Sequence, residues 1–277
     1  TAPYNTAMTH RGKAVVDAVA HLHAGGPIDI VVGHASFGTT FFVPNVLKIP
    51  VVAYVELPGY FSIYCREQFP ACYPQELMDV SLRALIHASV LQADLCLVPS
   101  SHAKKLFPVE LQPKVRVQPE GVSLPALIRD KVALRRALGI PVSGPIVGFA
   151  GRTLEAVRGF DVFIKVAKRI RASRKDVRFL VVGDEATIYG NETVYLAEKS
   201  FKRHVLETER MDEEALVFKP FMPHDDFAKH LQAMDLILFP IFEGAGNWAL
   251  YDAMAAGIPV LALNLCFIPG VMTHGHD

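Results

Sequence analysis

The chain has 277 residues, of which 51% are hydrophobic and 20% are charged, and these figures predict one large domain or two of ordinary size with a substantial buried core. The 28 basic and 28 acidic residues cancel, which argues against broad electrostatic capture of nucleic acid. No apolar run is long enough to span a bilayer. We expect the four scattered cysteines to be reduced thiols, as in a protein of the cytoplasm.

Short apolar runs alternate with helical patterns along the whole chain. The runs are rich in Val, Ile, Leu and Phe without regular polar alternation, which is typical of strands buried on both faces of a parallel sheet. In chain order the predicted strands are 29–32, 51–55, 95–99, 115–118, 145–150, 177–182, 215–218, 236–239 and 259–263. Amphipathic stretches at 12–23, 81–92, 161–172 and 225–233 are predicted as helices. The predicted fold class is therefore doubly wound α/β.

A boundary between two domains is predicted near residues 119–144. Glycines and prolines punctuate this stretch around a short basic helix at 130–138, and the pattern then restarts with a strand, a Gly-Arg turn and a helix. We predict two Rossmann-like domains, 1–125 and 126–277, that face a cleft, with ligands bound outside the carboxyl ends of the strands. The first domain begins on a helix rather than a strand, and the second stops directly after a strand and loop, so we expect the chain to be incomplete at both ends.

Two arginines follow the first predicted strand of the second domain. Arg152 comes directly after Gly151, and Arg158 stands just before the next predicted helix. Guanidinium groups near a helix N-terminus make a diphosphate site, because their forked donors match phosphate oxygens and the helix dipole adds positive potential. The alternative is that both arginines are solvated and pair with Glu155 or Asp161.

A loop of small residues with an acid on each side precedes the last predicted helix. Gly244 and Gly246 let a ligand approach the backbone, and the exposed N–H groups up to Asn247 suit an anion or sugar hydroxyls. Carboxylates accept hydrogen bonds from vicinal hydroxyls, so Glu243 and Asp252 suit a sugar and a ribose. The neighbouring tryptophan at 248 is expected to pack in the core, with stacking on a ligand as the alternative.

Together these features resemble the retaining glycosyltransferases of family four, which have the GT-B fold. The segment Ala-Met-Ala-Ala-Gly-Ile-Pro-Val at 253–260 fits a motif of that family residue for residue, and the block at 152–160 is similar to that of one bacterial subgroup. The resemblance extends over most of the chain. In the N-terminal half it rests on Gly33-His34, on the segments 52–56 and 107–114, and on Glu120-Gly121-Val122.

The resemblance implies roles for the predicted site residues. Arg152 and Arg158 would hold the diphosphate and stabilise the departing nucleoside diphosphate, with no metal and no cofactor. Asp252 would bind the ribose, and Glu243 with the backbone of 244–247 would orient the sugar hydroxyls. The chain departs from the family here, because eight residues rather than seven separate the two acids, and the second acid is Asp, which is a methylene shorter than Glu.

Further candidates stand at the carboxyl ends of other predicted strands. Gly183 and Asp184 are placed to border the nucleobase, although loop solvation explains them equally well. His34 and Glu56 can face the cleft from the first domain, with a structural role as the alternative for His34. Glu56 occupies the strand end at which many members of the family carry a histidine near the donor sugar.

The predicted function is transfer of a sugar from a UDP- or GDP-type donor to a hydroxyl of a glycan, lipid-linked or small-molecule acceptor, in glycan or polysaccharide synthesis. The alternatives are a nucleotide-sugar epimerase or hydrolase on the same fold and a non-catalytic nucleotide-sugar-binding module. A dehydrogenase is disfavoured, because the sequence contains no Gly-x-Gly-x-x-Gly fingerprint. Lys104, Lys105 and the helix around Arg83 could touch a lipid-linked acceptor at the inner face of a membrane, with a solvated face as the alternative.

Overall fold

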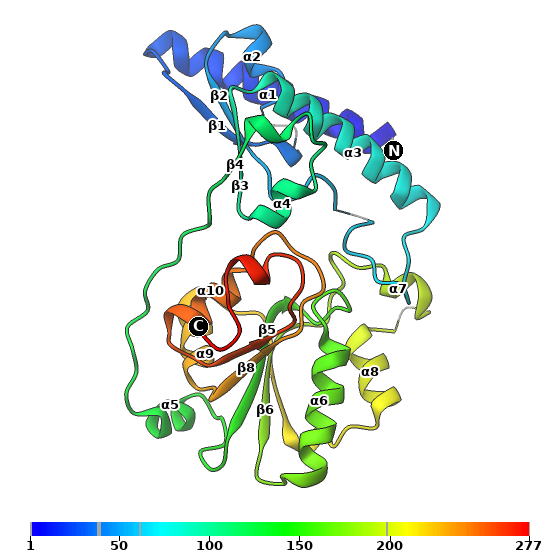
Figure 1. Ribbon diagram of the computed structural model, residues 1–277, viewed down its shortest axis with the longest axis vertical. Coiled ribbons are helices and arrows are strands. Elements are labelled where there is room, and N and C mark those ends of the chain that lie inside the picture. The colour runs from blue at the N-terminus through cyan, green and yellow to red at the C-terminus, as the bar shows by residue number, and fades with distance from the viewer. Residues whose placement is uncertain (1, 38–39, 61, 198, 277) are drawn as a thin grey trace.

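The protein consists of two α/β domains, which lie one above the other in Figure 1, a computed structural model that describes residues 2–37, 40–60, 62–197 and 199–276. The N-terminal domain has a four-stranded parallel sheet in the order β1-β2-β3-β4. The C-terminal domain has a five-stranded parallel sheet in the order β7-β6-β5-β8-β9. The prediction of an α/β fold with two parallel-sheet domains is confirmed.

The N-terminal domain buries one side of its sheet under a long helix. Its strands are β1 (Val31–His34), β2 (Val51–Tyr54), β3 (Leu95–Val98) and β4 (Val115–Val117), and its helices are α1 (Ala2–Gly25), α2 (Val43–Val46), α3 (Tyr73–Gln92) and α4 (Ser101–Lys105), with 3-10 turns at Ala35–Phe37 and Gln112–Lys114. Leu82 and Ile86 of α3 share one apolar core with Val51 and Ala53 of β2. The carboxyl ends of the strands in this sheet point toward the second domain (Figure 1).

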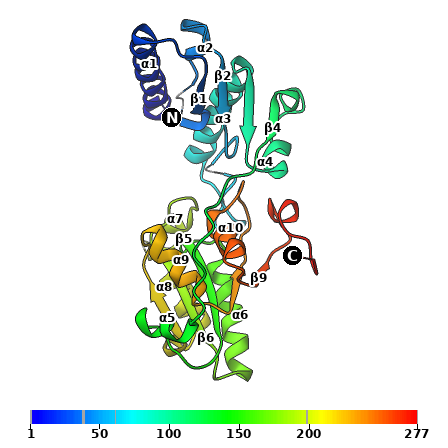
Figure 2. The same ribbon diagram turned by 90° about the vertical axis from the view of Figure 1, so that its left-hand side faces the viewer.

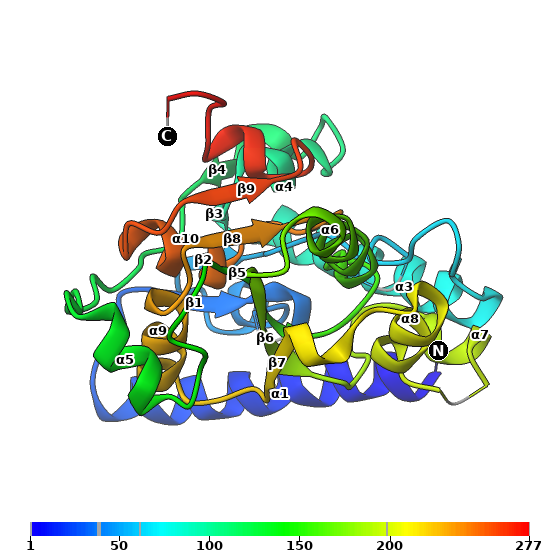
Figure 3. The ribbon, with the colours of Figure 1, turned by 90° about the horizontal axis from the view of Figure 1, so that it is seen from below.

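The C-terminal domain has helices on both faces of its sheet. Its strands are β5 (Ile146–Thr153), β6 (Arg178–Asp184), β7 (Leu216–Lys219), β8 (Leu236–Phe239) and β9 (Val260–Ala262), and its helices are α5 (Lys131–Ala137), α6 (Phe160–Ser173), α7 (Glu192–Tyr195), α8 (Phe201–Glu209), α9 (His224–Gln232) and α10 (Trp248–Ala255), with 3-10 turns at Glu213–Ala215 and Ile268–Gly270. Phe160 and Phe201 place α6 and α8 in one core, whereas Leu231 and Leu250 place α9 and α10 in another. Figure 3 shows these two layers on opposite sides of the strands.

Strand β5 continues past the end that the sequence predicts for it. The prediction stops at Ala150, but pairing with β6 resumes at Thr153, which stands opposite Asp184 after an irregularity in the register. Backbone pairing therefore holds Gly151 and Arg152 within the last residues of β5 rather than in a free loop.

The domains are joined by the linker between β4 and α5, and they also touch on the other side, where the segment between β2 and α3 reaches α6 and α7 (Figure 1). Nη1 of Arg66 lies 2.7 Å from Oδ1 of Asp161, and the Arg66 guanidinium lies 3.8 Å from the centre of the Phe242 ring. The Asn191 side chain donates a hydrogen bond of 2.7 Å to the Pro70 carbonyl. These contacts close one edge of the space between the sheets.

After β9 the chain turns back toward the N-terminal domain, so that its last turn lies beside α4 (Figure 2). A Cβ atom at Gly270 would lie 3.4 Å from the Ser101 hydroxyl. Within the described ranges, none of the helices combines the length and the apolar character that a membrane span needs.

Candidate functional site

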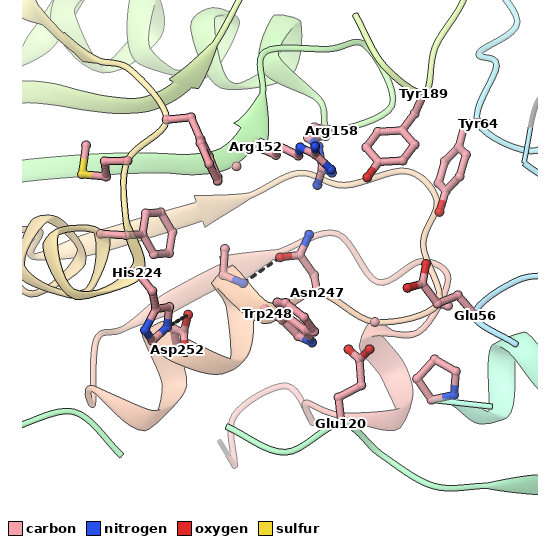
Figure 4. A pocket seen from close by; sticks show the side chains of 18 residues that line it. Glu56, Tyr64, Glu120, Arg152, Arg158, Tyr189, His224, Asn247, Trp248 and Asp252 are labelled. Atoms are coloured by element: carbon pink, nitrogen blue, oxygen red, sulfur yellow. Dashed lines mark hydrogen bonds and ion pairs between the residues drawn. The ribbon is translucent and has the colours of Figure 1, made fainter. Parts of the chain in front are cut away.

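A cavity of about 600 Å³ lies where the two domains face each other (Figure 4). The C-terminal ends of the strands in both sheets border it, as expected for parallel α/β domains. The residues that line it are Glu56, Tyr64, Pro99 and Glu120 from the N-terminal side, and Gly151, Arg152, Arg158, Tyr189, Phe221, Met222, His224, Phe227, Ala245, Gly246, Asn247, Trp248, Ala249 and Asp252 from the C-terminal domain.

Both arginines that the sequence singles out line this cavity, together with Gly151. Arg152 is exposed and has no ion-pair or hydrogen-bond partner among the residues that the structure describes. Arg158 is partly buried and forms an ion pair with Glu155, as the alternative expects for this arginine, but the 3.9 Å between its Nε and Oε2 of Glu155 is too long for a hydrogen bond. The alternative that Asp161 neutralises them does not apply, because Asp161 pairs with Arg66.

The Glu155 carboxylate organises the loop opposite the arginines. It is completely buried, at 0% exposure, and its Oε1 accepts hydrogen bonds from the backbone N–H groups of Ile188, Tyr189 and Gly190 at 2.6, 2.6 and 3.2 Å. The Thr153 hydroxyl donates to its other oxygen. This arrangement sets the Tyr189 ring at the cavity wall, where the neighbouring guanidinium of Arg158 lies 5.2 Å from the ring centre.

The turn after β6 supports the cavity rather than lining it. Gly183 has a φ of 152°, and a Cβ atom there would lie 2.8 Å from the carbonyl oxygen of Gly151, so the two strand ends come into close contact. Oδ1 of Asp184 accepts a hydrogen bond of 2.9 Å from the Phe221 N–H. Gly183 and Asp184 are thus not among the lining residues, but Asp184 fixes the loop whose Phe221 is one of them.

The acid at the far side of the loop, Asp252, is buried on α10 and lines the cavity. Its Oδ2 lies 3.0 Å from Nε2 of His224, the first residue of α9. Three apolar side chains, Phe221, Met222 and Phe227, line the wall next to this pair. The sequence gives no signal for His224, because a histidine at a helix start has many structural uses.

Glu243 and Gly244 do not line the cavity. Oε1 of Glu243 lies 2.6 Å from Nε2 of His102 on α4, and it also accepts a hydrogen bond of 2.8 Å from the Gly244 N–H. Glu243 therefore spans the domain boundary beside the cavity. The resemblance implies that Glu243 orients the sugar hydroxyls, and in this structure the acid lies outside the cavity lining.

The remaining part of this loop does reach the cavity, through Gly246 and Asn247. The Asn247 side chain caps α10 by accepting a hydrogen bond of 2.9 Å from the Ala249 N–H. Trp248 also lines the cavity and is 68% exposed, so the prediction that it packs in the core is wrong. The small-residue loop therefore forms one wall of the cavity from its second glycine onward.

On the N-terminal side, Glu56 lines the cavity and His34 stands behind it. Nε2 of His34 lies 3.8 Å from Oε1 of Glu56. The imidazole ring is packed between aromatic rings, 4.5 Å from the Phe37 ring centre and 5.3 Å from the Tyr54 ring centre. This packing orients His34 as a neighbour of Glu56 rather than as part of the cavity wall.

Glu120 is a lining residue that the sequence motifs did not single out for the site. Its Oε1 accepts a hydrogen bond of 2.8 Å from the Tyr54 hydroxyl, and the Trp248 side chain donates to the same carboxylate. Burial raises the pKa of the Glu120 carboxyl group, and the nearby charge of Glu56 adds to this effect. The usable signal is its place directly after the fourth strand, at the carboxyl end where ligands bind.

Across the residues that the structure describes, no group of three or more His, Cys, Asp or Glu side chains is arranged to hold a metal ion. The four cysteines are free thiols. Burial raises the pKa of Cys96 to about 12 and that of Cys266 to about 11.

Comparison with curated proteins finds glycosyltransferases. The chain is 30% identical over 170 residues to the D-inositol 3-phosphate glycosyltransferase of Stackebrandtia nassauensis, covering 59% of this chain and 36% of that protein. It is 31% identical over 145 residues to the 2-deoxystreptamine glucosyltransferase of Streptomyces kanamyceticus, covering 50% of this chain and 34% of that protein. The matched region thus spans about a third of the length of these relatives.

Comparison with solved structures finds the same two-domain fold. Anabaena HepE, solved in complex with UDP and glucose, superimposes with a TM-score of 0.68 at 18% identity, covering 95% of this chain and 67% of that one. Sucrose-phosphate synthase from Thermosynechococcus elongatus gives a TM-score of 0.68 at 17% identity, covering 90% and 59%. At these identities the likeness shows the fold alone.

Family descriptions match both domains. Residues 2–127 match the glycosyl transferase family 4 group, and residues 144–277 match the glycosyl transferases group 1. The first match ends in the linker between β4 and α5, and the second begins after α5, so each match contains the whole of one sheet. With one match for each domain and a GT-B arrangement of the two sheets, the chain belongs to the family 4 and group 1 glycosyltransferases.

Proposed function

We propose that the chain binds a nucleoside-diphosphate sugar in the interdomain cavity and transfers the sugar, with retention of its configuration, to a hydroxyl group of an acceptor. The observation that carries this proposal is the pair formed by Arg152, at the end of β5, and Arg158, in the turn before α6. Arg152 has no protein counter-ion in the described part of the chain, and both guanidinium groups line the cavity. A diphosphate supplies the negative charge that this position lacks.

The two arginines would stabilise the leaving group. As the bond from the sugar carbon to the diphosphate oxygen breaks, negative charge grows on that oxygen, and forked guanidinium donors match it. The charge that a metal ion supplies in other phosphate sites is provided here by side chains. We therefore propose that transfer is independent of a metal ion and of an organic cofactor.

The nucleoside would lie at the end of the cavity formed by α9 and α10. Asp252 can accept hydrogen bonds from ribose hydroxyls, and His224 beside it extends the reach of this shorter acid. Phe221, Met222 and Phe227 offer an apolar wall for a planar base. The similar fold of Anabaena HepE was solved with UDP, and a uridine donor is our first choice.

The acceptor would enter from the side of the N-terminal domain. Its hydroxyl oxygen forms a bond to the sugar carbon on the face from which the diphosphate leaves, and its proton passes to the departing phosphate oxygen. Glu56 stands at this end of the cavity and can accept a hydrogen bond from the acceptor. The family membership of both domains favours transfer over epimerisation or passive binding of the nucleotide sugar.

Calorimetric titration of UDP and GDP tests the arginine pair. The double variant Arg152→Ala and Arg158→Ala should bind the preferred nucleotide more weakly by roughly 3 kcal/mol or more, since each charge-assisted hydrogen bond contributes about 1.5–3 kcal/mol. Arg116→Ala, which changes an exposed arginine of β4, is the matched control and should bind as the parent does.

Equal affinity of the parent and the double variant would exclude the arginines as the diphosphate site. Transfer itself is tested by incubating the protein with UDP-, GDP- and dTDP-sugars and candidate acceptors. Release of nucleoside diphosphate together with sugar on the acceptor supports the proposal, whereas inversion at a sugar carbon without transfer would replace it with an epimerase.

A further inference from the structure

We infer that Glu120 is the carboxylate that contacts the transferred sugar, in place of Glu243. This inference rests on the proposed function and names a contact within the same cavity. The sugar must lie beyond the diphosphate from the nucleoside, because the diphosphate links the two. Figure 4 shows Asp252 and His224 at one side of the cavity, Glu56 at the other side, and Glu120 between Trp248 and Glu56.

The direction of the Glu120 side chain is fixed from both domains. The Tyr54 hydroxyl, from β2, holds its Oε1 at 2.8 Å. On the other side, a Cβ atom at Gly246 would lie 3.1 Å from its Oε2, and the Trp248 side chain donates to the same carboxylate. The carboxylate of the N-terminal domain is therefore pressed against the loop that borders the donor.

Hydrogen-bond capacity remains on this carboxylate. Its two oxygens offer about four acceptor positions, and Tyr54 and Trp248 occupy two of them. No Lys, Arg or His side chain within the described ranges pairs with Glu120. A neutral ligand with neighbouring hydroxyl groups, such as a hexose, supplies donors of the right kind for the remaining positions.

The competing acid, Glu243, is held at the domain boundary outside the cavity lining. Glu243 is bonded to His102 across the domain boundary and to the Gly244 N–H, and it lies outside the lining residues. Releasing it toward the cavity would break a contact of 2.6 Å between two largely buried side chains. Glu120 needs no such rearrangement. Since Glu120 belongs to the N-terminal side, its contact with the sugar exists only while the domains are closed.

The test is a double-mutant cycle, in which one change removes the carboxylate from the protein and the other removes a hydroxyl group from the donor sugar. We measure dissociation constants of UDP, UDP-glucose and the monodeoxy forms of UDP-glucose, or the GDP compounds if the parent prefers GDP. In the parent, loss of the contacted hydroxyl should weaken binding about tenfold, as for one hydrogen bond to a charged group. In Glu120→Gln that further loss should become smaller, because the amide is uncharged and has a single acceptor oxygen, while the affinity for the bare nucleotide stays within about twofold of the parent.

Glu110→Gln makes the same substitution at an exposed position and should behave as the parent. Tyr54→Phe retains the Glu120 carboxylate without its orienting hydroxyl and should give a smaller change in the same direction, which covers the case in which Glu120→Gln folds poorly. Two results would overturn the inference and leave the proposed function in place. In the first, Glu120→Gln binds the nucleotide and loses the same affinity as the parent with each deoxy donor. In the second, Glu243→Gln rather than Glu120→Gln reduces the loss of affinity for the deoxy donor. A parent that binds neither UDP nor GDP would overturn the proposed function and this contact with it.

Discussion

At the scale of single residues, the Glu120 carboxylate is partly buried and has neighbours that raise its pKa and neighbours that lower it. Burial raises its pKa first, Glu56 raises it further, and the hydrogen bonds from Tyr54 and Trp248 act in the opposite direction. The net effect is unfavourable for the charged form. A group kept at some cost to stability at a cavity wall is typical of a ligand contact, because a purely structural position gains nothing from the charge.

This balance predicts how stability changes with pH. The folded pKa of Glu120 lies above its ordinary value of 4.5, so the stability that its protonation contributes is present below about pH 4.5 and is lost as the pH rises through the raised pKa. Glu120→Gln cannot ionise. The Tm of this variant relative to the parent should therefore increase from pH 4.5 to pH 7, measured by thermal unfolding. A difference that stays constant or decreases would contradict the assigned burial.

Two histidines show where residue-level prediction stops. The arginine pair and both acids could be located from local motifs, because strand ends and glycines mark binding loops. The direction of each acid depends on a partner distant in sequence: His102 lies 141 residues from Glu243, and His224 lies 28 residues from Asp252. No local pattern encodes such pairs, so the motif identified the loop while the fold decided which carboxylate faces the cavity.

At the scale of elements, the loop between β6 and α7 depends on one buried acid. Glu155 accepts three backbone hydrogen bonds from residues 188–190 and has no exposure to solvent. Water cannot replace these bonds easily, since the carboxylate is enclosed. The position of Tyr189 at the cavity wall therefore follows from a side chain in the turn between β5 and α6.

Glu155→Ala should destabilise the protein by roughly 3–5 kcal/mol, because it leaves buried N–H groups without an acceptor. Urea unfolding measures this change, and hydrogen exchange at Ile188 and Tyr189 should become faster. Glu185→Gln alters an exposed acid of the same loop that pairs with Lys202, and it should change stability by less than about 1 kcal/mol. If Glu155→Ala were as stable as this control, the loop would be held by other contacts.

The strands themselves were predictable, but their ends were not. All nine predicted apolar runs form strands, since burial on both faces leaves a continuous apolar signal. The ends shift by up to three residues, as in β5, which continues to Thr153 because its partner β6 offers backbone hydrogen bonds there. That extension decides the place of Arg152, and it depends on the neighbouring strand rather than on the local sequence.

At the scale of the whole molecule, Arg66 links the two domains. Its guanidinium pairs with Asp161 at 2.7 Å and stacks on Phe242, and both charged side chains are only about one-seventh exposed, at 14% and 15%. Arg66→Ala should weaken domain contact by roughly 2 kcal/mol. Small-angle scattering should then show a larger radius of gyration, and donor turnover should fall because Glu120 and the glycine loop meet less often.

Arg116→Ala removes an exposed arginine of the same domain and should leave both the scattering and the turnover unchanged. An Arg66→Ala protein with the parent's radius of gyration and turnover would mean that the other contacts, such as that of Asn191 with Pro70, are sufficient. The sequence predicted two domains facing a cleft but not this contact. The periodicity of apolar residues predicts helices and strands, but it does not predict which distant charged residues form an ion pair between two domains.

The bare backbone at Gly246 has a consequence for how such chains can vary. A Cβ atom at Gly246 would meet both a carboxylate oxygen of Glu120 and the Tyr251 hydroxyl at 3.1 Å, which is tighter than an ordinary van der Waals contact. A side chain at this position would displace the Glu120 carboxylate or the Tyr251 hydroxyl by a few tenths of an ångström. Homologous chains that carry a side chain at this position should therefore carry a shorter one at the position of Glu120, and the two should change together.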